Sequence, residues 1–139
     1  VVSEQEVVRT TNKAKVKNDA YSLTATYVLT GEDASYSGVT PGNNFALDGE
    51  GWGAFEVAAR VGQLDVDDDA FIGPAATRLA NPNASASKAK NYGFGLNWYL
   101  NKNVKLSANY SDTRFDGGAA AGADRDAEKA IFSRVQLSY

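Results

Sequence analysis

The fold is decided by residues 91–110, which read NYGFGLNWYLNKNVKLSANY. Apolar or aromatic side chains take every second position over residues 92–100, and glycine or asparagine takes most positions between them. The same alternation resumes over residues 104–110, after an Asn-Lys-Asn stretch whose asparagines tolerate turn geometry. A side-chain period of two is typical of β-strands, so this stretch predicts two antiparallel strands joined by a tight turn.

The same alternation appears in other parts of the chain. It is clear in residues 20–30 and 129–139, less regular in residues 54–63, and ambiguous in phase in the β-prone residues 1–10. No capped helical pattern lies between these segments, which argues against a parallel sheet with crossover helices. The sequence therefore predicts an all-β, antiparallel fold. About six strands are expected, at residues 1–10, 20–30, 54–63, 91–100, 104–111 and 129–139.

The composition excludes several kinds of chemistry. The 139 residues contain no cysteine, histidine or methionine, so disulfides, thiolate metal sites and histidine-based catalysis are absent from this chain. We therefore expect no enzyme, no cofactor and no metal site. The net charge of −3 predicts no nucleic-acid partner. No apolar run is long enough for a transmembrane helix, but strands that cross a membrane remain open because their hydropathy signal is weak.

The placement of aromatic residues separates two architectures that fit these strands. A soluble barrel is apolar inside, whereas a transmembrane barrel is apolar outside and polar inside. In an antiparallel arrangement the aromatics gather at two levels with smaller apolar residues between them, as expected for the two interfaces of a membrane. This favours a transmembrane β-barrel. The predicted girdle residues are Tyr27, Trp52, Trp98 and Tyr139 at one level and Tyr21, Tyr92 and Tyr110 at the other.

Basic residues are enriched in the strands. The five clearest strands hold four basic residues and one acidic residue, Glu56. Arg60, Lys105 and Arg134 fall on the polar face, where they would line a pore and attract anions. The alternative is that each pairs with a carboxylate of a neighbouring strand, Glu56 included.

The long connections at residues 31–51, 65–87 and 116–128 are predicted to lie at the strand ends. An acidic run at residues 65–69 has carboxylates at some of the positions of a calcium loop, but it lacks that motif's glycine and final glutamate. We interpret it as a solvated loop. Lys13, Lys15 and Lys17 are predicted to lie in the first connection, at one rim.

Several blocks of sequence, in the same order, resemble the C-terminal part of the phosphate-selective porin O and P family. The blocks are residues 27–39, 51–71, 92–110, 113–118 and 124–139. The resemblance implies an outer-membrane barrel of about sixteen strands in a Gram-negative bacterium. It also implies passive diffusion of small anions such as phosphate or polyphosphate, a homotrimer, and contact with outer-membrane lipid and lipopolysaccharide. The constriction loop of that family lies in an earlier part of the barrel.

Six strands are too few to close a membrane barrel, and an open sheet edge is costly in hydrocarbon. Because the chain also begins with Val1 and not methionine, we expect residues 1–139 to be the C-terminal portion of one barrel domain with upstream strands missing. Two alternative functions stay open. One is a general or sugar-type diffusion porin with little charge selectivity, and the other is a soluble β-barrel binding module.

Overall fold

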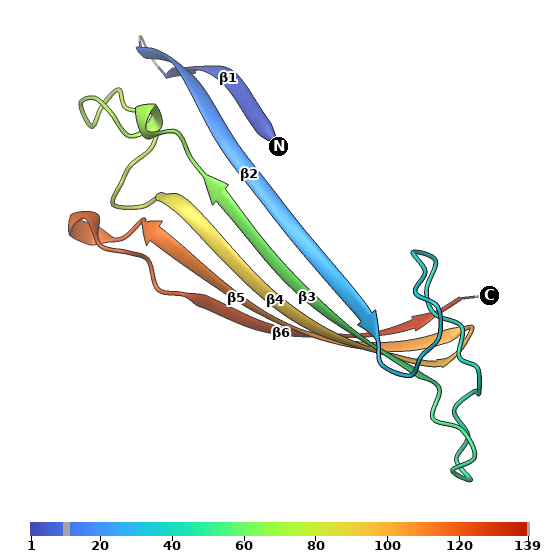
Figure 1. Cartoon of the computed structure of the whole chain (residues 1–139). Helices are drawn as coiled ribbons and strands as arrows, with labels where there is room; N and C mark the ends of the chain where they lie inside the picture. Colours follow the sequence, from blue (N-terminus) through green and yellow to red (C-terminus); the bar gives the residue numbers. More distant parts are fainter. Residues whose placement is uncertain (10–11, 139) are drawn as a thin grey trace. The chain divides into compact units, whose positions relative to one another are not determined.

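The computed structural model describes residues 1–9 and 12–138. Six strands form one sheet, hydrogen-bonded in the order β1-β2-β3-β4-β5-β6, so each strand pairs with its neighbours in sequence (Figure 1). Within the part of the chain that the structure describes, no helix is long and apolar enough to cross a membrane. The strands are β1 Val2–Arg9, β2 Asn12–Val28, β3 Ala54–Asp65, β4 Ala86–Asn101, β5 Val104–Gly117 and β6 Glu128–Leu137, with 3-10 turns η1 Asp68–Ala70 and η2 Ala120–Gly122.

The six expected strands are confirmed, but four of them are longer than predicted: β3 by two residues, and β2, β4 and β5 by six each. β2 begins at Asn12, so the prediction that the lysines at positions 13, 15 and 17 lie in a connection is wrong: they are strand residues. β4 begins at Ala86 and β5 continues to Gly117. Many of the extra strand residues are charged or polar, although Val16 is apolar and only 5% exposed, and in β2 their backbones pair with β1. Opposite charges meet there, as in the pair Lys15–Glu4, whose charged atoms are 3.8 Å apart.

The predicted tight turn between β4 and β5 is confirmed. The side-chain oxygen of Asn101 accepts hydrogen bonds from the backbone N–H groups of Asn103 (2.8 Å) and Val104 (3.0 Å), which closes the turn locally. The side-chain amide of Asn103 donates to the Ser138 carbonyl at 2.6 Å, and the Ser138 N–H donates to the Asn103 carbonyl at 2.8 Å. The turn is therefore tied to the end of β6.

The chain divides into two compact units, which are described separately. Unit 1 comprises Val1–Leu23, Val61–Asn91 and Asp112–Glu128, and unit 2 comprises Thr24–Arg60, Tyr92–Ser111 and Lys129–Tyr139. Every ion pair among the described residues belongs to unit 1. The buried apolar cluster belongs to unit 2 and consists of Val28, Val39, Ala54 and Tyr99.

In unit 1, Asp67 fastens the connection after β3 to the side of β2. Its carboxylate accepts hydrogen bonds from the backbone N–H groups of Lys17 (2.7 Å) and Asp69 (3.1 Å), while its own N–H donates to the Asn18 side chain at 3.1 Å. The Lys17 N–H, followed by the Asp69 N–H, lowers the pKa of Asp67 below its ordinary value. These hydrogen bonds show that the acidic run is part of a loop anchored to β2. Among the described residues no three acidic side chains are arranged to hold a metal ion.

Candidate functional site

The site lies in unit 2, on one face of the sheet, which we call the polar face. Alternate residues of neighbouring strands point to it because successive side chains of a strand point to opposite faces. Together with a loop segment at residues 34–38, they line an open groove of about 630 Å³. The strand residues in the lining are Thr24, Thr26, Glu56, Asn97, Tyr99, Lys105 and Gln136.

Glu56 is the buried carboxylate of this face, with only 7% of its surface exposed. It accepts hydrogen bonds from the Asn97 side-chain amide at 2.8 Å and from the Tyr99 hydroxyl at 2.9 Å. The Ser107 hydroxyl donates to the Asn97 side-chain oxygen at 2.7 Å and extends the network to β5. A buried charge needs such donors, since its desolvation is otherwise costly. The network therefore fixes the Tyr99 ring in place.

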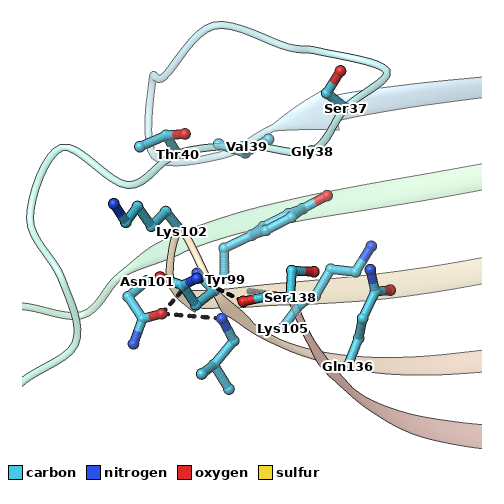
Figure 2. Close-up of a pocket in the computed structure, with 12 residues that line it drawn as sticks. Ser37, Gly38, Val39, Thr40, Tyr99, Asn101, Lys102, Lys105, Gln136 and Ser138 are labelled. Carbon is cyan, nitrogen blue, oxygen red and sulfur yellow. Dashed lines mark hydrogen bonds between the residues drawn. The ribbon is translucent and has the colours of Figure 1, made fainter.

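Lys105 lies beside this network. Its ammonium nitrogen is 5.2 Å from the centre of the Tyr99 ring, a cation–π distance. Figure 2 shows Tyr99 extending toward the loop segment, with Lys105 and Gln136 next to it. Among residues 1–9 and 12–138, Lys105 makes no ion pair. Its positive charge is therefore available to a solute in the groove.

Arg60 and Arg134, the other two predicted site residues, share this face. Arg60 is four residues from Glu56 on β3 and Arg134 is two residues from Gln136 on β6, so each arginine points to the same face as that groove residue. Both arginines are exposed. Neither makes an ion pair with any residue that the structure describes. The alternative in which the basic residues pair with Glu56 is thus not observed, because Glu56 is bonded to an amide and a phenol instead.

A loop segment that the sequence analysis did not connect with the site, residues 34–40, covers part of the polar face. Val39 is only 3% exposed and packs in the cluster that contains Tyr99. Gly38 lies so close that a Cβ atom there would be 3.4 Å from the Tyr99 ring. The segment borders a smaller cavity of about 70 Å³, which Lys102 and Lys105 also line (Figure 2). The connection between β2 and β3 lacks any periodic pattern, so its length was the only feature of the sequence that could have pointed to a role at the site.

Four of the predicted girdle residues point away from the polar face. By strand alternation Tyr27, Trp98, Tyr92 and Tyr110 point opposite to the groove residues of their strands. Exposed fractions are 59% for Tyr21, 69% for Tyr27, 67% for Trp52, 46% for Tyr92 and 41% for Tyr110. Tyr139 lies outside the described residues. Contact of these rings with lipid stays a prediction.

Comparisons with known proteins agree with the resemblance seen in the sequence. Porin O of Pseudomonas aeruginosa is 32% identical to this chain over 131 residues, which cover 89% of this chain and 27% of that protein. The chain therefore spans about a quarter of the length of this curated relative. No solved structure matches the chain. The family model described as phosphate-selective porin O and P matches residues 3–139, and the chain belongs to that family.

Proposed function

We propose that this chain supplies the C-terminal strands of an outer-membrane barrel, of about sixteen strands, in a Gram-negative bacterium. The polar face of unit 2 is the pore wall, through which small anions such as phosphate or polyphosphate diffuse passively. Family membership and the sheet of six strands in sequence order support this proposal. The relative named Porin O supports it further. A pore wall carries out no bond chemistry, so we propose no catalytic role.

One observation carries the anion preference. Arg60, Lys105 and Arg134 share a face and make no ion pair among the described residues. In contrast, Lys88 is paired with Asp65, with charged atoms 3.0 Å apart. Unpaired positive charges along a pore wall raise the local concentration of anions and repel cations.

The neighbours of these charges suit diffusion more than tight binding. Conduction requires a site that is attractive enough to enter and weak enough to leave. Around Lys105 the groove offers neutral hydrogen-bonding groups, including Thr24, Asn97 and Gln136, and no second strand cation. Such groups can replace part of the hydration shell of an anion without holding it.

The direct test is the reversal potential of the full-length protein in a planar bilayer under a salt gradient. We expect anion selectivity, reduced by Lys105→Glu and by Arg134→Glu because each reverses a charge on the pore wall. Lys129→Glu is the matched control, since Lys129 lies on the opposite face of β6 from Arg134. Cation selectivity of the unmodified protein would contradict the proposal.

A second candidate function is a general or sugar-type diffusion porin. Most groove residues are neutral hydrogen-bonding groups, and the Tyr99 ring could stack against a sugar. Competition experiments on chloride current distinguish the two functions. Block of the current by phosphate supports the anion pathway, whereas block by neutral sugars without any effect of phosphate supports the alternative.

The proposed assembly is a homotrimer in contact with outer-membrane lipid and lipopolysaccharide. The exposed aromatic side chains opposite the polar face, such as Tyr27 and Tyr92, fit the interfacial region of a membrane. Mass measurement of the full-length protein in detergent tests the trimer. A monomer that conducts with unchanged selectivity would contradict the assembly but leave the pore proposal intact.

A further inference from the structure

The connection between β2 and β3 contacts both faces of the sheet in unit 2. Trp98 and Tyr99 are consecutive in β4, so their side chains point to opposite faces. Gly38 and Val39 pack on Tyr99, on the polar face. Phe45, further along the same connection, packs on Trp98, with ring centres 5.1 Å apart and an edge-to-face angle of 81°. The connection therefore passes around the end of β4, from the polar face to the opposite one.

On that opposite face, Trp98 holds the returning part of the connection by several contacts. Its indole N–H donates to the Trp52 carbonyl at 2.6 Å, and its ring stacks on Phe55 at 5.5 Å. The Phe45 N–H donates to the Leu100 carbonyl at 2.7 Å, which fixes the backbone next to the ring contact. Trp98 therefore contacts the connection at two residues, Phe45 and Trp52.

The Trp98 contacts on Phe45 lie only a few residues along the chain from the loop segment on the polar face. Phe45 follows Thr40 by five residues, and each residue spans at most about 3.6 Å. Pro41 lies between them, is buried and has a restricted backbone. The Gly42 N–H donates to the Glu32 carboxylate at 3.2 Å and closes the segment into a loop. We therefore expect a displacement of Phe45 to shift the base of this loop.

We propose that Trp98, which points away from the pore, is a positioning residue that holds residues 34–40 across the polar face. The inference rests on the proposed pore function. Tyr36 is the residue through which the segment obstructs the passage, since its side chain is fully exposed and borders the groove. Trp98 does not contact the solute. It affects the cross-section of the pore indirectly, because it sets the position of residues 34–40.

A distance measurement tests the positioning role independently of current. Spin labels are attached at Ser37→Cys and Gln136→Cys, both at the groove, in the full-length protein without other cysteines. We expect Trp98→Ala and Phe45→Ala to shift the distance distribution to longer, broader values, and Trp98→Phe to restore it in part. Phe94→Ala is the matched control because Phe94 is on the same face of β4. An unchanged distribution in both alanine variants would overturn the inference.

Conductance supplies the second readout. Trp98→Ala and Tyr36→Ala are each expected to raise single-channel conductance. In the Tyr36→Ala background the Trp98→Ala effect should be smaller than in the unmodified protein, because both variants act on the same segment. Fully additive effects contradict the inference. A full-length protein that passes no current overturns the proposed function, whereas the label distances still decide the positioning role.

Discussion

Position 53 requires glycine for two separate reasons. Its φ is +70°, a region that costs other residues about 1–3 kcal/mol. A Cβ atom there would also lie 2.2 Å from the Tyr99 carbonyl oxygen. We expect Gly53→Ala to lower the urea midpoint of the refolded full-length protein more than Gly31→Ala does, since Gly31 has φ +95° but no atom within 4 Å. Equal midpoints would show that the close approach is relieved by a small backbone shift.

Among the residues that line the groove, Glu56 is the acidic one. Glu56→Gln keeps an oxygen that can accept the bonds from Asn97 and Tyr99 but removes the charge. We expect stronger anion selectivity in reversal-potential measurements, with little change in thermal stability. Glu56→Ala leaves both donors without their acceptor and should cost about 1–3 kcal/mol. If Glu56→Gln left the reversal potential unchanged, the groove would not be the conducting path.

At the scale of elements, the Asp67 contacts decide how firmly the β3–β4 connection is attached to β2. Because the pKa of Asp67 is lowered from 3.8, the stabilisation is present above pH 3.8 and is lost as the pH falls through the lower folded-state value. We expect hydrogen exchange at the Lys17 amide, corrected for its intrinsic rate, to accelerate in that acidic range.

The matched variants separate this contact from a general effect of charge. Asp67→Ala should accelerate Lys17 exchange at neutral pH, whereas Asp68→Ala should not, because the Lys17 N–H donates to the Asp67 carboxylate. Equal protection in the two variants would contradict the anchoring role. Exchange at the Asp69 amide in the same variants shows whether the 3-10 turn η1, capped by Asp67, depends on that carboxylate.

At the scale of the whole molecule, β1 and β6 are the end strands of the sheet. Each presents backbone groups that none of the six described strands pairs, and such groups cost several kcal/mol each in hydrocarbon. We expect the 139-residue chain alone to give no stable current steps in a planar bilayer, while the full-length protein does. Uniform steps from the isolated chain as a monomer would contradict the view that further strands complete the barrel.

The sequence by itself determined the strands, the β4–β5 turn, the residues that share a face, and the family. These features are local: a period of two over residues 92–100 or the turn chemistry of Asn101 depends on neighbours in the chain. Strand ends were harder to predict. The residues from Asn12 to Asp19 are mostly charged or polar, and their alternation is short because only Ala14 and Val16 are apolar, so pairing with β1 shows them to be a strand.

Only the tertiary structure decided what the polar face contacts. Glu56 is bonded to Asn97 and Tyr99 and not to a basic residue, a choice made by strand register. The path of the β2–β3 connection around β4 depends on contacts of Phe45 with Trp98, which are more than fifty residues apart in sequence. Such contacts form through space, so no periodicity along the chain reports them.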